Sequence, residues 1–136
     1  MFTCTDFNVN EIKMPDLKSV LIVDDSALSR SIIRGFIQKK YPECVVYEAP
    51  TGDDAIKMAA VQAPQLITLD VNMPGMDSFE AASQLQKLCP SARMAVITAN
   101  IQQSVRKKLQ GLGILFLAIV EKPVTEGGVQ RILDAM

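Results

Sequence analysis

The sequence predicts an α/β domain built on one parallel β-sheet, and three observations lead to this fold class. After about residue 17, short apolar runs alternate five times with segments of helical periodicity. The apolar runs are continuous and rich in β-branched residues, which is typical of strands that helices cover on both faces. Residues able to carry chemistry directly follow four of the runs: Asp24-Asp25, Asp70, Thr98 and Lys122.

Five strands and five helices are expected after an aperiodic tail at residues 1–17, which precedes a domain at 18–136. The strands are predicted at residues 20–23, 44–49, 66–70, 94–98 and 114–120. The first helix, residues 26–40, repeats apolar residues at helical spacing. Its predicted inner stripe is Leu28, Ile32, Phe36, Ile33 and Ile37, with Arg30, Arg34 and Gln38 facing outward.

The other helices are predicted from their caps and breakers. Residues 53–62 follow Thr51, a predicted N-cap with Asp54 three residues on, and stop before Pro64. A loop at residues 71–76 contains Pro74-Gly75, and Asp77 or Ser78 begins a helix that reaches about residue 89. The last two helices are expected at residues 101–112 and 126–135.

Length, charge and cysteine content limit the classes of function. A chain of 136 residues predicts one domain, with no room for a separate output or DNA-binding module. The net charge of −1 gives no basic surface for nucleic acid or an anionic membrane, and the longest apolar run is too short to span a bilayer. Three widely spaced cysteines fit a reducing compartment. We therefore expect a cytoplasmic monomer that binds neither nucleic acid nor membrane.

The chain has no histidine, which excludes several catalytic arrangements. Ser-His-Asp and Cys-His nucleophilic sites, most metalloenzyme ligand sets and a phosphohistidine carrier role all require that residue. If the chain carries out phosphoryl chemistry, another residue type must accept the group, and a carboxylate can do so.

Charge at the carboxyl edge of the predicted sheet points to a divalent cation. Parallel strands end at one edge, where open α/β sheets place their ligand sites. Carboxylates about 5 Å apart repel by ~3 kcal/mol at an effective dielectric of ~20. Asp24, Asp25 and Asp70 give −3, and Mg²⁺ with Lys122 gives +3, so the sum is zero. Singly, each residue has an ordinary structural explanation, such as a helix cap for the acidic pair or a strand residue for Thr98.

Together, these segments resemble a response-regulator receiver domain, similar to the single-domain chemotaxis-type regulators. The matching segments are VLIVDDS (residues 20–26), EAPTG (48–52), LITLDVNMPGMD (66–77), VITA (96–99) and KP (122–123). The resemblance covers residues 18–136. It implies a doubly wound, flavodoxin-like fold with five helices on both faces of a parallel sheet in the order 2-1-3-4-5.

The resemblance also implies a role for each site residue. Asp70 would be the phosphoacceptor, attacking the phosphohistidine of a partner histidine kinase or a small phosphodonor. Mg²⁺ would be held by Asp25, a carboxylate oxygen of Asp70 and the backbone carbonyl of Asn72, with Asp24 acting through a water. Lys122 would pair with Asp70 and then with the phosphoryl oxygens, and Thr98 would hydrogen-bond the phosphoryl group.

In such a domain, phosphorylation of Asp70 changes the surface that a partner reads. The chain would catalyse phosphoryl transfer to Asp70 and hydrolysis from it, without being an enzyme for another substrate. The phosphoryl group would draw the Thr98 hydroxyl inward and rearrange the face made by residues 101–112, 114–120 and 126–135. A separate output protein or phosphatase would bind that face.

Three residues or segments depart from the family pattern. Ser78 stands where a glycine is usual, and a modest loop change is expected there. Ile119 stands where a tyrosine, phenylalanine or histidine usually swings inward, and its β-branched side chain has few rotamers. The segment at residues 113–122 is longer than usual by two or three residues, so Phe116 takes the switch role only if a bulge shifts the strand.

Three alternatives compete with this interpretation, and two of them lack the sequence pattern that they require. Ile119 and the altered fifth strand favour a receiver-like module that binds its partner regardless of phosphorylation. A haloacid-dehalogenase-type phosphohydrolase would need an Asp-x-Asp-x-Thr/Ser pattern, which Asp24-Asp25-Ser26 lacks. A flavodoxin-type FMN site would need a glycine- and hydroxyl-rich first loop, which is also missing.

Overall fold

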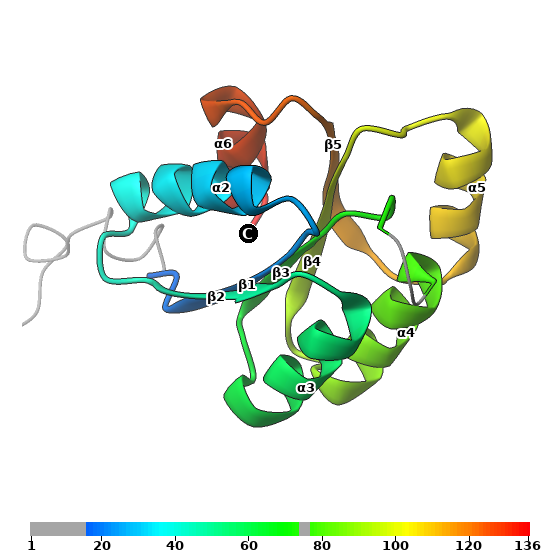
Figure 1. The fold of residues 1–136 in the computed structure, drawn as a ribbon, viewed down its shortest axis with the longest axis horizontal. Coiled ribbons are helices and arrows are strands. Elements are labelled where there is room, and N and C mark those ends of the chain that lie inside the picture. Colours follow the sequence, from blue (N-terminus) through cyan, green and yellow to red (C-terminus); the bar gives the residue numbers. More distant parts are fainter. Residues whose placement is uncertain (1–15, 74–76) are drawn as a thin grey trace, which may run out of the picture.

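The computed structural model, which describes residues 16–73 and 77–136, contains one parallel five-stranded sheet (Figure 1). Its order is β2-β1-β3-β4-β5, which confirms the predicted fold class and strand order. The strands are β1 (Ser19–Val23), β2 (Val45–Ala49), β3 (Leu66–Leu69), β4 (Arg93–Thr98) and β5 (Phe116–Glu121). Because the order reverses direction between β1 and β3, the loops after these two strands diverge and leave room for a site at the carboxyl edge.

Helices cover both faces of the sheet, as the continuous apolar strands predicted. They are α2 (Ala27–Lys40), α3 (Gly52–Gln62), α4 (Ser78–Leu88), α5 (Gln103–Gly111) and α6 (Glu126–Asp134). Helices α2 and α6 pack on one face, and α3, α4 and α5 pack on the other (Figure 1). None of the helices in the described ranges is long and apolar enough to cross a membrane.

Side-chain caps fix where most helices begin. Thr51 accepts a hydrogen bond from the Asp54 backbone N–H at 3.1 Å, which confirms the predicted cap of α3. Asp77, one of the two residues predicted for α4, caps it by accepting from the Phe79 N–H. Pro74-Gly75, predicted to lie in the preceding loop, falls outside the described residues, as does most of the predicted tail. Leu17 is buried in the core, so packing begins two residues before β1.

The predicted inner stripe of α2 is partly wrong. Ile33 and Ile37 are buried, but Leu28 is 71% exposed and Ile32 is 36% exposed. Arg30 and Arg34, predicted to face outward, instead reach Glu48 on the edge strand β2. Helical periodicity could not show this, because Glu48, the partner of both arginines, lies on another element, the edge strand β2.

The fifth strand, β5, contains a β-bulge, in line with the extra length of residues 113–122. Met94 of β4 pairs with Phe116 and Val96 pairs with Ile119, so two steps along β4 match three along β5. The extra residue forms a β-bulge, and it places Phe116 and Ile119 against the same α5-side cluster. The strand begins at Phe116, two residues later than predicted, and Leu115 before it is 89% exposed.

Candidate functional site

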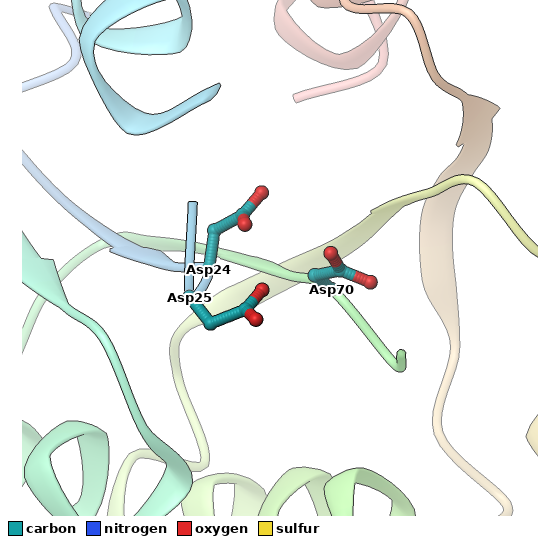
Figure 2. Close-up of side chains that lie close together, drawn as sticks. All are labelled: Asp24, Asp25 and Asp70. Carbon is teal, nitrogen blue, oxygen red and sulfur yellow. The ribbon is translucent and has the colours of Figure 1, made fainter. Parts of the chain in front are cut away.

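Three carboxylates converge at the carboxyl edge of the sheet. Asp24 and Asp25 follow β1, and Asp70 follows β3, which is the direct neighbour of β1 with Val23 opposite Leu69. One carboxylate oxygen from each residue lies within 4.8 Å of the other two. Figure 2 shows the three side chains emerging from the ends of these two strands. The predicted juxtaposition of Asp70 with the acidic pair is therefore present.

Both oxygens of the Asp70 carboxylate have protein donors. Oδ1 accepts a hydrogen bond from the Thr98 hydroxyl and another from the Asn72 backbone N–H, each at 2.8 Å. Oδ2 accepts from the Lys122 ammonium, also at 2.8 Å. The side chain is only 4% exposed. Predicted partners from β4 and from the end of β5 thus hold Asp70 in one orientation.

Lys122 contacts two carboxylates rather than the one that was predicted. Its Nζ lies 2.8 Å from Asp70 Oδ2 and 2.8 Å from Asp24 Oδ2. The backbone N–H of Lys122 donates a hydrogen bond to the Thr98 carbonyl, and this bond places Lys122 at the carboxyl edge of the sheet. Burial lowers the pKa of the ammonium, but its contacts with Asp24 and Asp70 outweigh this and leave the pKa above its ordinary value.

Asp24 is a buried carboxylate held in a fixed position. Its Oδ1 accepts from the Ser26 backbone N–H at 2.9 Å, and its own backbone N–H donates to the Ala49 carbonyl on β2. Burial raises the pKa of the Asp24 carboxyl, and the Lys122 and Ser26 contacts offset that rise only in part. Asp25, beside it, is exposed to solvent.

The donor set fits a hard divalent cation. With Lys122 included, the three carboxylates still sum to −2, and carboxylate oxygens are the ligands that Mg²⁺ prefers. The exposed Asp25 carboxylate leaves an approach from solvent. Asn72 is placed beside the cluster by its N–H contact with Asp70. That the backbone carbonyl of Asn72 binds the metal stays a prediction.

The predicted switch residues Ile119 and Phe116 lie at different distances from Thr98 along the sheet. The Thr98 hydroxyl is completely buried and already donates to Asp70. Ile119 pairs with Val96, two residues before Thr98, and packs against the α5 cluster of Val105 and Leu109. Phe116 pairs with Met94, four residues from Thr98 and thus ~13 Å along the strand. The bulge therefore does not bring Phe116 to the Thr98 end of the strand.

Sequence reasoning missed one residue at this site. Arg30 donates from Nη1 to the Asp24 backbone carbonyl and from Nε to the Glu48 carboxylate. The available signal was a single glutamate, Glu48, in an otherwise apolar edge strand. Because its partners are 14 and 18 residues away, the pairing depends on how α2 lies over β2.

Comparison with known proteins agrees with this geometry. The family model for the response regulator receiver domain matches residues 20–134. The chemotaxis protein CheY of Thermotoga maritima is 35% identical over 88 residues, covering 65% of this chain and 72% of that protein. A protein-glutamate methylesterase/protein-glutamine glutaminase of Syntrophus aciditrophicus is 35% identical over 104 residues, covering 76% of this chain. The matched segment is only 30% of that protein's length.

A solved structure gives the same fold. Vibrio cholerae CheY4 superposes with a TM-score of 0.75 at 23% sequence identity, covering 86% of this chain and 96% of that one. The solved structure shows the fold, and the family model covers residues 20–134. The chain therefore belongs to the response regulator receiver domain family of two-component signalling.

Proposed function

We propose that this chain accepts a phosphoryl group on Asp70, donated by the phosphohistidine of a partner kinase or by a small phosphodonor. One observation carries the proposal: the Asp70 carboxylate lies within 4.8 Å of two further carboxylates while Lys122 and Thr98 hold its two oxygens. A hollow of about 510 Å³ is lined by Asn72, whose N–H contacts Asp70, and by residues 99–102 and Glu121.

The proposed chemistry is a phosphoryl transfer between two nucleophiles. A carboxylate oxygen of Asp70 attacks phosphorus, the O–P bond forms, and the P–N bond to the donor imidazole breaks with its electron pair staying on nitrogen. Lys122 and Thr98 then donate to phosphoryl oxygens instead of carboxylate oxygens. Such a transfer needs positioning and charge neutralisation and little else from the protein.

Four groups would hold Mg²⁺ in this proposal. Asp25, Asp70 and the backbone carbonyl of Asn72 would bind it directly, and Asp24 would act through a water. When bound, the ion neutralises charge on the transferring group. The exposed Asp25 and the remaining −2 charge of the cluster support this assignment.

Hydrolysis of the aspartyl phosphate would end the signal, so the chain would act as a signalling domain and not as an enzyme for another substrate. The face made by α5, β5 and α6 would carry the signal to a separate output protein or phosphatase. Thr98 connects Asp70 to β4, which pairs with β5, and this path supports the assignment.

Mass spectrometry tests the proposal directly. Incubating the chain with acetyl phosphate and Mg²⁺ should add one phosphoryl group, and Asp70→Asn should remove the adduct. Asp53→Asn, which removes an exposed carboxylate on α3, is the matched control and should still be modified. An adduct of equal yield on Asp70→Asn would contradict the proposal.

A second candidate function is a module that binds its partner regardless of phosphorylation. The specific observation is that Thr98 already donates to Asp70 and Ile119 is already packed against the α5 cluster, so less remains to rearrange. This function predicts equal partner affinity with and without beryllofluoride. A clear difference in affinity would reject it and favour the phosphorylation-dependent switch.

A further inference from the structure

We propose that Arg30 is a positioning residue for the metal site, holding the peptide group between Asp24 and Asp25 through the Asp24 carbonyl. The inference rests on the proposed function, since metal binding by the acidic pair is itself proposed. It concerns a residue on α2 that touches no carboxylate of the cluster.

Arg30 ties three elements together at the edge of the site. Its Nη1 donates to the Asp24 backbone carbonyl at 2.6 Å, and its Nε donates to Glu48 Oε1 on β2 at 2.9 Å. The side chain is 15% exposed, so water competes little for these donors. The guanidinium therefore links α2, β2 and the loop after β1 in a fixed fork geometry.

The carbonyl that Arg30 holds determines where Asp25 lies. The Asp24 N–H is fixed by Ala49, its Oδ1 by Ser26 and its Oδ2 by Lys122, so the carbonyl is the fourth anchored point of this residue. Because the peptide group is planar, the direction of that carbonyl sets the position of the Asp25 Cα. Within residues 16–73 and 77–136, no side-chain hydrogen bond or ion pair holds the Asp25 carboxylate. Its position therefore depends on the backbone.

Arg34 provides a matched comparison. It pairs with the other oxygen of Glu48 and is one helical turn further along α2. Its other contact is to the backbone carbonyl of Val46, within β2, and not to the acidic pair. Removing either arginine thus costs one Glu48 ion pair and one backbone contact, but only Arg30 touches the loop after β1.

The electrostatic and the positioning explanations predict opposite changes in the affinity for Mg²⁺ when Arg30 is removed. Arg30 is a cation bonded to the backbone of the acidic pair, so neutralising it should strengthen binding of a divalent cation by reducing repulsion. If Arg30 instead holds the carbonyl in place, its removal should weaken binding because the ligands lose their arrangement. Groups that orient metal ligands typically account for about 10- to 100-fold in affinity.

Titration calorimetry with Mg²⁺ alone, at pH 7, tests the inference. We expect Arg30→Met to weaken Mg²⁺ binding about tenfold, and Arg34→Met to stay within about twofold of the wild type. Arg30→Lys keeps the charge but cannot span Glu48 and the Asp24 carbonyl, so it should also be weakened. Thermal melting should show both variants destabilised, because each loses a Glu48 partner, with a smaller loss in Arg34→Met because that side chain is 37% exposed against 15% for Arg30.

Several outcomes would overturn the inference. Unchanged or tighter Mg²⁺ binding by Arg30→Met would do so while leaving the proposed function standing, and so would wild-type affinity in Arg30→Lys. Equal weakening in Arg34→Met would assign the effect to general loosening of α2. If Arg30→Met fails to fold, the Mg²⁺ affinity of Arg30→Lys decides whether the inference holds. Absence of Mg²⁺ binding by the wild type would remove the metal site and this inference together.

Discussion

Lys122→Met is the sharpest test of how the acidic edge is stabilised. Methionine keeps an unbranched side chain of similar length, so the substitution removes the ammonium with little change in packing. Lys122 lies 2.8 Å from both Asp24 and Asp70, which are 1% and 4% exposed. Without it, two buried carboxylates face each other with no cation between them.

The expected loss of stability follows from that geometry. Two carboxylates less than 4.8 Å apart repel by about 3 kcal/mol at an effective dielectric of about 20. Removing one partner of a buried ion pair typically costs about 3–5 kcal/mol. We therefore expect Lys122→Met to lose about 3 kcal/mol in EDTA, which lowers the melting temperature of a domain of this size by roughly 10 °C.

Urea unfolding and thermal melting, in EDTA and in Mg²⁺, measure the effect. Lys39→Met is the control, because Lys39 also lies 2.8 Å from a carboxylate, Glu126, but both side chains are largely exposed. That variant should lose less than about 1 kcal/mol. Mg²⁺ should stabilise Lys122→Met more than the wild type, since the site charge changes from −2 to −3.

Equal stability of Lys122→Met and Lys39→Met in EDTA would refute this reasoning, because burial is the feature that distinguishes the two lysines. A Mg²⁺ effect smaller in Lys122→Met than in the wild type would contradict the charge argument independently.

Two further predictions concern metal binding and pH. Mg²⁺ at ten times its dissociation constant should stabilise the wild type by ~1.4 kcal/mol, and Asp25→Asn should largely remove this stabilisation. A urea midpoint of the wild type that is unchanged on adding Mg²⁺ would argue against an intact site. Burial raises the pKa of Glu48, but hydrogen bonds from Arg34 and Arg30 outweigh it and hold the pKa below its ordinary value. The contacts of Arg30 and Arg34 with Glu48 therefore contribute stability above about pH 4.3, and this stability is lost as pH falls through the lowered pKa of Glu48. Glu48→Gln should cost about 1–2 kcal/mol of unfolding free energy at pH 7 and much less near pH 3, as measured by urea unfolding. A Glu48→Gln loss that is equal at both pH values would show that the ion pairs do not contribute it.

The sequence alone was sufficient for the fold and for most of the site. Continuous β-branched runs alternating with helical periodicity predicted the parallel sheet, because only strands covered on both faces are apolar at every position. Asp24, Asp25, Asp70, Thr98 and Lys122 follow such runs directly, so parallel pairing alone brings them to one edge. Local capping signals such as Thr51 were likewise readable from the sequence.

The tertiary structure decided the features that depend on partners far away in the chain. Periodicity placed Leu28 and Ile32 inside and Arg30 outside, whereas the position of α2 over the edge strand leaves Leu28 71% and Ile32 36% exposed and brings Arg30 to Glu48. The bulge that pairs Val96 with Ile119 could not be placed either, because strand register is set by the neighbouring strand. Contact of Lys122 with both Asp24 and Asp70 arises for the same reason: sequence order gives the strand ends, but only the packed sheet sets the distances between their side chains.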